Sequence, residues 1–269
     1  MDGHIKAFFQ PASEDAPGGH FRCVIPLHEG PDIAWEEVSQ RCPQLPRGWY
    51  ELALLPTRDR IEFTRDFWLM KLPFHPLLSP FLNEFFNSLS NVGVYVTQRK
   101  FDDPYEAHLV YGLGDDRGFF RGSPPATEEN ISNIKAQFAE FVLPVDYLMF
   151  LEIHDGFFKY TDTGLTTTDK LYAKYRDFQA FLEQRDTLLT SEGTPVNPTR
   201  LIPFYESFGF PCYQCFWAEW YPEHEMGNIY YSGLTNTISN HMSDRSSPEN
   251  MAFPTYLDWL MFYLETIKI

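Results

Sequence analysis

Two consecutive prolines near the middle of the chain constrain its fold more than any other sequence feature. Pro124 and Pro125 lie in the segment 122–126, and proline lacks a backbone N–H and has a fixed φ, so neither a helix nor a sheet continues through the pair. With 269 residues the chain is long enough for one large domain or two smaller ones. We favour two, and predict an accessory N-terminal domain over residues 1–124 and a C-terminal domain over residues 125–269.

The composition is that of a folded, acidic protein. Hydrophobic residues make up 43% of the chain and aromatic residues 17%, so enough apolar surface exists to offset the entropy lost on folding. The net charge is −16, and the acidic residues are spread along the whole chain. Such a surface repels the phosphates of nucleic acids, and no basic stripe counteracts that repulsion. A basic protein partner is compatible with this charge, whereas nucleic acid is not expected.

The sequence carries no signal for secretion or for membrane insertion. The first residues lack a basic region followed by an apolar run, and no apolar run approaches the ~18 residues that a membrane helix needs. The four cysteines, at positions 23, 42, 212 and 215, are too few and too unevenly placed for a disulfide framework. We therefore expect a soluble, cytoplasmic protein and leave its oligomeric state open.

The N-terminal half reads as several helices followed by a small sheet. We predict a short strand at 21–25, and helices at 32–41, with Asp32 as the cap, at 58–72 and at about 76–90. Residues 49–55 are apolar and remain ambiguous. Three runs rich in β-branched and aromatic residues, at 92–99, 107–113 and 119–121, predict an antiparallel meander.

The C-terminal half is organised around a short apolar helix within residues 143–156. Pro144 suits the first turn of this helix, and Gly156 suits the position just after its end. Thr127 is expected to cap the preceding helix, and further helices are predicted at about 170–188 and 253–267. Strands are expected at 201–204, 212–221 and 227–232, the last two joined by the turn 222–226. The order of elements predicts an α+β fold in which helices pack on a mixed or antiparallel sheet.

Residues about 127–269 resemble the SUKH superfamily of Smi/Knr-type proteins. The segments that carry the resemblance are 143–156, with its leucine-proline, acidic-tyrosine and phenylalanine-leucine pairs, then 201–204, 227–231 and 253–260, in the order expected for the family. The chain departs from the pattern at His154-Asp155-Gly156, where asparagine-glycine is usual, and in its whole N-terminal half. The resemblance implies a non-enzymatic protein-binding module: many bacterial members look like immunity proteins that bind and neutralise toxins, and fungal members regulate signalling and cell-wall synthesis.

The most enzyme-like feature is the pair Cys212 and Cys215 after Pro211. Zinc deaminases carry a Pro-Cys-x-x-Cys motif together with His-x-Glu, but none of the six histidines from His4 to His154 is followed by glutamate at that spacing. His224 is the only nearby further metal ligand, and on a strand the two cysteines point to opposite faces. We interpret them as buried strand residues, with a metal-dependent hydrolase or deaminase-like enzyme using Cys212, Cys215 and His224 as the alternative.

The histidine-carboxylate neighbours of the sequence are a weaker enzymatic signal. His154-Asp155, and His224 between two glutamates, could serve as general bases, but both sit at predicted turns without a nucleophile motif. We therefore predict no catalytic residue, no cofactor and no metal site.

Aromatic and acidic residues of the predicted strand 212–221 and the turn 222–226 form the predicted partner-binding face. It consists of Trp217, Glu219, Trp220, Glu223 and Glu225. Aromatic anchors within a charged surround are typical of protein recognition, and the acidic charge suits a basic toxin or effector.

Overall fold

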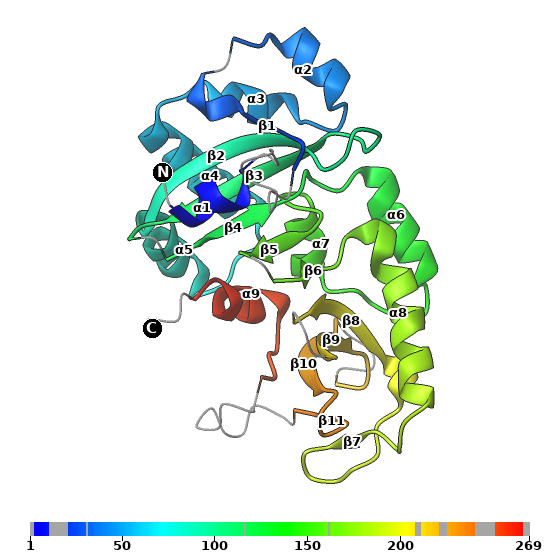
Figure 1. The fold of residues 1–269 in the computed structure, drawn as a ribbon. Coiled ribbons are helices and arrows are strands. Elements are labelled where there is room, and N and C mark those ends of the chain that lie inside the picture. The colour runs from blue at the N-terminus through cyan, green and yellow to red at the C-terminus, as the bar shows by residue number, and fades with distance from the viewer. Residues whose placement is uncertain are drawn as a thin grey trace. The chain divides into compact units, whose positions relative to one another are not determined.

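In a computed structural model of the chain, the described residues are 3–10, 21–30, 32–115, 117–160, 162–207, 211–220, 225–239 and 251–265 (Figure 1). They form two compact units. The first unit comprises residues 1–125 and 157–160, and the second comprises 126–156 and 161–269. Both units combine helices with a largely antiparallel sheet, which confirms the α+β class. None of the described helices is long and apolar enough to cross a membrane.

The sheet of the first unit has five strands in the order β1-β2-β3-β4-β5, all antiparallel. The strands are β1 (Cys23–Pro26), β2 (Leu89–Gln98), β3 (Glu106–Leu113), β4 (Phe119–Gly122) and β5 (Phe157–Lys159). The predicted meander of β2, β3 and β4 is confirmed. The structure differs from the predicted division of the chain at β5, which lies within residues 125–269 but pairs with β4. There Phe157 stacks on Phe120 with ring centroids 5.6 Å apart.

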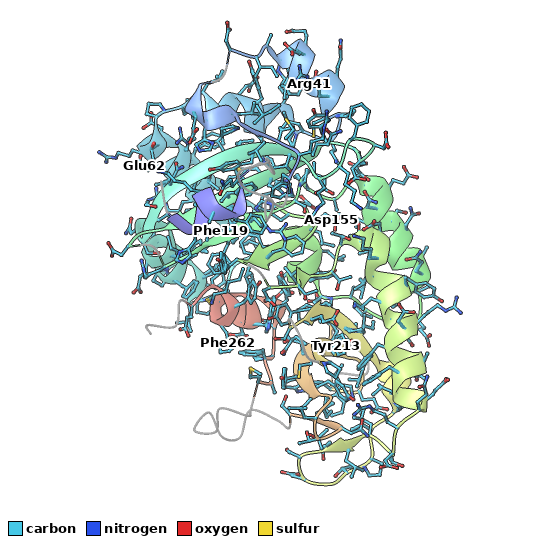
Figure 2. All side chains as sticks on the ribbon, viewed as in Figure 1. Arg41, Glu62, Phe119, Asp155, Tyr213 and Phe262 are labelled. Atoms are coloured by element: carbon cyan, nitrogen blue, oxygen red, sulfur yellow. The ribbon has the colours of Figure 1, made fainter. Side chains whose placement is uncertain are left out.

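Helices cover both faces of this sheet. They are α1 (Gly3–Phe8), η1 (Leu27–Glu29), α2 (Trp35–Arg41), α3 (Arg47–Ala53), α4 (Thr57–Lys71) and α5 (Leu78–Asn87). On one face, Trp68 of α4 and Phe86 of α5 pack edge-on against Tyr111 of β3. On the other face, Phe9, just after α1, stacks on Tyr95 of β2. Phe119, labelled in Figure 2, belongs to the same cluster as Phe9 and Tyr95. The expected Asp32 cap was wrong, because α2 begins only at Trp35, after Ala34.

The sheet of the second unit has six strands in the order β6-β8-β9-β10-β11-β7. They are β6 (Gly164–Leu165), β7 (Leu189–Thr190), β8 (Leu201–Glu206), β9 (Cys212–Trp217), β10 (Gly227–Ser232) and β11 (Thr237–Ile238), with η2 (Pro198–Arg200) before β8. All neighbours are antiparallel except β11 and β7, which run parallel. The predicted pairing of β9 with β10 is confirmed.

The helices of the second unit sandwich its sheet. They are α6 (Glu128–Gln137), α7 (Val145–Leu151), α8 (Thr168–Glu183) and α9 (Tyr256–Leu264). On one face, Tyr147 of α7 and Tyr256 of α9 both contact the ring of Phe216. On the other face, Phe178 of α8 packs on Tyr213, which Figure 2 shows beside that helix.

Two predicted helix ends can be compared directly with the structure. Thr127 caps α6 in a capping box with Asn130, as predicted for Thr127. Pro144 lies one position before the first turn to which it was assigned, because it is the N-cap of α7. The assignment of Gly156 to the helix end was wrong, because α7 already ends at Leu151. Gly156 has a φ of 103° and serves the turn that leads into β5.

Candidate functional site

The first unit contains an apolar groove between α3 and α4. It is lined by Trp49, Leu52 and Leu55 on the side of α3, by Phe63 and Phe67 of α4, and by Leu109 of β3. The cavity has a volume of about 350 Å³. We call these six residues the α3–α4 groove.

Large apolar side chains around this groove are exposed to solvent. Phe63 is 60% exposed, Leu55 is 37% exposed and the neighbouring Leu54 is 66% exposed. Burying the exposed part of each side chain would stabilise a complex by less than the roughly 1.5–3 kcal/mol that complete burial of an exposed side chain contributes. An exposed apolar patch beside a concave surface is typical of a site that binds another molecule.

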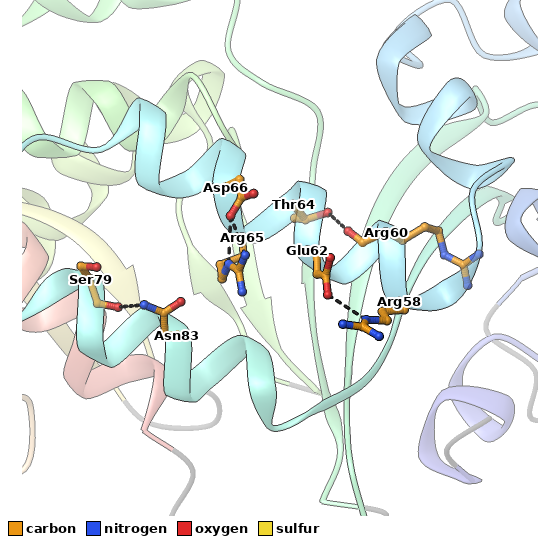
Figure 3. A network of polar contacts seen from close by, with 8 residues as sticks. All are labelled: Arg58, Arg60, Glu62, Thr64, Arg65, Asp66, Ser79 and Asn83. Carbon is orange, nitrogen blue, oxygen red and sulfur yellow. Dashed lines mark hydrogen bonds and ion pairs between the residues drawn. The ribbon is translucent and has the colours of Figure 1, made fainter.

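Two exposed ion pairs lie on α3 and α4, and Glu51 is the one of their four residues that lines the groove. Arg47 Nε lies 2.9 Å from Glu51 Oε1 on α3. Arg58 Nε lies 2.8 Å from Glu62 Oε1 on α4, and Figure 3 shows this second pair. All four side chains are about half exposed or more. Exposed pairs of this kind contribute about 0–1 kcal/mol, so a partner could replace them at little cost.

The turn between α3 and α4 is held in place by the buried guanidinium of Arg60. Its nitrogens donate to Val92 O and Leu55 O, both at 2.6 Å, and to the side-chain oxygens of Thr57 and Asn91. The next turn of α4 is fixed by Thr64, whose hydroxyl donates to Arg60 O at 2.7 Å (Figure 3). Burial lowers the pKa of Arg60, because its four acceptors are neutral and only partly replace the lost hydration. Arg60 therefore fixes the end of the groove at which α3 meets α4.

The sequence analysis did not single out the groove. It left residues 49–55 ambiguous and interpreted 58–72 only as a helix. The available signal was the spacing of Phe63 and Phe67, whose i, i+4 positions put both rings on one side of α4. That signal could not show which side of the helix stays uncovered.

The two tryptophans among the predicted partner-binding residues pack within the second unit. Trp217 is buried in the core cluster that includes Phe178 and Tyr231. Trp220 is partly buried against that cluster, and its ring lies so close over Gly227 that a Cβ there would stand 2.6 Å from Cε3. Trp217 therefore has little surface to offer a partner.

The acidic members of that predicted face differ in their surroundings. Glu225 accepts a hydrogen bond from the backbone N–H of Val145, at 3.2 Å, and so caps the start of α7. Glu219 is exposed, and Glu223 lies outside the described residues. The structure brings Trp217 and Trp220 together, with ring centroids 6.4 Å apart.

The predicted cysteine pair lies on β9 with both side chains buried. Cys215 packs in the core cluster beside Ile229, and burial raises the pKa of its thiol well above the ordinary value. Cys212 shares a hydrogen bond with the hydroxyl of Tyr230, and His224 lies outside the described residues. Within the part of the chain that the structure describes, no group of three or more His, Cys, Asp or Glu side chains is arranged to hold a metal ion.

The pair His154 and Asp155 is part of the fold of the second unit. Asp155 accepts hydrogen bonds from the backbone N–H of Thr168, at 2.7 Å, and from its hydroxyl, at 2.6 Å. It thereby caps the start of α8, while burial raises its pKa. His154 is fully buried.

Comparison with known proteins assigns the chain to no family. No family model matches it, and no curated protein matches it either.

Proposed function

We propose that this protein is a non-enzymatic protein-binding module and that the α3–α4 groove is its docking surface. The observation that carries the proposal is the combination of a cavity of about 350 Å³ with apolar walls and exposed Phe63 and Leu55 at its border. Protein interfaces concentrate their binding energy where a few apolar anchors enter such a pocket and exclude water.

The biological setting that we propose follows from the SUKH resemblance of residues 127–269. The resemblance favours either neutralisation of a toxin or regulation through a bound partner. The candidate partner is a basic toxin or effector. A cytoplasmic location is part of this proposal and is supported by the four cysteines, which are free thiols.

Peptide selection on matched variants tests the docking surface. The full-length protein is used as bait for a display library of 16-residue peptides, beside Phe63→Asp and Met70→Asp. Both substitutions place a carboxylate on an exposed residue of α4, but Met70 does not line the groove. We expect a set of peptides that binds the wild type and Met70→Asp and loses affinity for Phe63→Asp by about 30-fold, which corresponds to about 2 kcal/mol.

The proposal fails if no peptide depends on Phe63. Equal enrichment on all three baits would mean that the groove is not the docking surface. Circular dichroism of the two variants checks that each remains folded.

A further inference from the structure

A buried histidine lies on the face of the first sheet that α1 covers. His108 of β3 is 4% exposed, and the centroid of its ring lies 6.4 Å from that of Phe9, just after α1. The next residue, Leu109, lines the α3–α4 groove. Successive residues of a strand face opposite sides of a sheet, so His108 points away from that groove. It is therefore separate from the proposed docking surface.

The surroundings of His108 favour its neutral form. Neither ring nitrogen makes a hydrogen bond within the described part of the chain. Glu106 Oε2 lies 3.6 Å from His108 Nε2, too far for a hydrogen bond, and 4.0 Å from Arg99 Nε. Burial is the largest influence and lowers the pKa of His108. Arg121 of β4 and Arg99 act in the same direction, and Glu106 opposes them. Tyr95, opposite His108 on β2, stays protonated because burial raises its pKa.

α1 is held on the sheet by apolar packing. It has six residues, which is too short for a helix to be stable by itself. Ile5 and Phe9 belong to the core cluster on this face of the sheet (Figure 1). Of the titratable residues of α1, Lys6 is exposed and His4 packs edge-on against Tyr160. The position of α1 therefore depends on the apolar surface beneath it.

A second histidine packs on the same face, under η1 instead of α1. The ring of His28 meets that of Tyr95 edge-on at 4.9 Å, and its Nδ1 lies 3.2 Å from Val94 O. Burial lowers the pKa of His28, and Arg60 acts in the same direction, whereas the contact with Val94 O and the charge of Glu29 oppose them. Its titration is therefore a separate event, to be followed at residues 27–30.

We infer that α1 is a pH-operated cover: on acidification His108 takes up a proton, and α1 with Phe9 leaves this face of the sheet. In the closed form the imidazolium would lie beneath an aromatic ring and beside two arginines, whereas opening hydrates it. Opening is then coupled to the uptake of one proton. The ratio of open to closed molecules therefore rises by up to tenfold per pH unit below about 6.5, the ordinary pKa of histidine.

Hydrogen exchange of the full-length protein, read by mass spectrometry on peptides that cover residues 3–10, tests this inference. Exchange is measured from pH 7 to pH 4.5 and corrected for the pH dependence of the intrinsic rate. Between pH 6 and pH 5 we expect protection to fall by about five- to tenfold in the wild type and to change less than about twofold in His108→Gln. His75→Gln is the control, because His75 lies in the loop between α4 and α5, and it should behave as the wild type does.

Two neutral replacements beside His108 should change the pH response in opposite directions. In the closed form Glu106 favours the protonated imidazole and Arg121 opposes it, while water screens both charges in the open form. We expect the total loss of protection between pH 7 and pH 4.5 to increase in Glu106→Gln and to decrease in Arg121→Gln. A merely structural role of these residues would change protection by the same factor at every pH.

Two results would overturn the cover. One is protection of residues 3–10 that stays constant from pH 7 to pH 5 in the wild type, and the other is a loss on acidification that His108→Gln retains. Circular dichroism at pH 7 checks that His108→Gln is folded. If that variant does not fold, the opposite changes in Glu106→Gln and Arg121→Gln decide the test, and changes of the same sign overturn the inference.

Discussion

At the scale of single residues, Arg60 shows how a charged side chain can serve as a core residue. It is 4% exposed, yet it donates to four oxygen atoms, among them the carbonyls of Leu55 and Val92. The buried charge of Arg60 is tolerated because a guanidinium carries five donors in a rigid fork, so one side chain satisfies several buried acceptors at once. Lysine, with a compact ammonium group, could not reach the same set.

Replacing Arg60 should destabilise the first unit strongly. We expect Arg60→Met to lower the free energy of unfolding by about 3 kcal/mol, because buried carbonyls lose their donor while the methionine replaces only the apolar stem. Urea unfolding followed by tryptophan fluorescence measures the change. Arg58→Met is the control, since Arg58 is exposed and pairs only with Glu62, and its unfolding midpoint should stay within error of the wild type. Coinciding midpoints for both variants would show that the Arg60 contacts contribute nothing net.

At the scale of elements, α7 and α9 are joined by the carboxylate of Asp146. Its Oδ2 accepts from the backbone N–H of Leu257 in the first turn of α9, and its Oδ1 accepts from Tyr147 N, both at 2.9 Å. One residue of α7 thus caps a helix that begins 110 positions later in the chain. Burial is the largest influence on this carboxyl and raises its pKa, while the backbone donors act in the opposite direction.

The raised pKa of Asp146 makes a signed prediction for the dependence of stability on pH. Asp146 has a pKa of about 3.9 in the unfolded chain. Between that value and the raised pKa, the folded state binds more protons than the unfolded state, so this group makes stability fall as pH rises through its folded pKa. We expect the unfolding free energy of Asp146→Asn minus that of the wild type to increase from pH 4 upward and then to level off. Urea titrations at unit pH steps measure it, and a difference that does not change with pH would contradict the prediction.

At the scale of the whole molecule, each of the two units is built from two separate stretches of the chain. It leaves the first unit after Pro125 and returns to it for Phe157–Tyr160 before completing the second. The returning strand β5 is the edge of the first sheet, and Phe157 also meets Trp68 edge-on at 5.8 Å. A cut at the prolines therefore removes a strand and a core aromatic residue from the first unit.

The two fragments made by a cut at Pro125 should behave differently. Residues 126–269 keep their own sheet and helices and are expected to fold. Residues 1–125 lack β5, expose the edge of β4 and should aggregate or remain loosely packed. Adding a synthetic peptide of residues 153–164 to the 1–125 fragment should restore near-ultraviolet circular dichroism and a monomeric elution volume. Cooperative folding of residues 1–125 without the peptide would show that β5 is dispensable.

The sequence by itself determined the fold class and several of the local elements. Three features depend on neighbouring residues, so their physical causes can be read along the chain: the break at Pro124 and Pro125, the cap at Thr127, and the β-branched and aromatic runs of β2, β3 and β4. For the same reason, the placement of Cys212 and Cys215 as buried residues of a strand was correct.

Tertiary structure alone decided which apolar surfaces stay exposed. Trp217 and Phe63 are both large and aromatic, yet one is in the core and the other borders a groove, because exposure depends on which distant elements pack nearby. The assignment of β5 to the first sheet was likewise decided by pairing across 35 positions of sequence, between Gly122 and Phe157. Hydrophobic periodicity shows that a helix or strand has an apolar face, and only tertiary packing determines whether that face is covered.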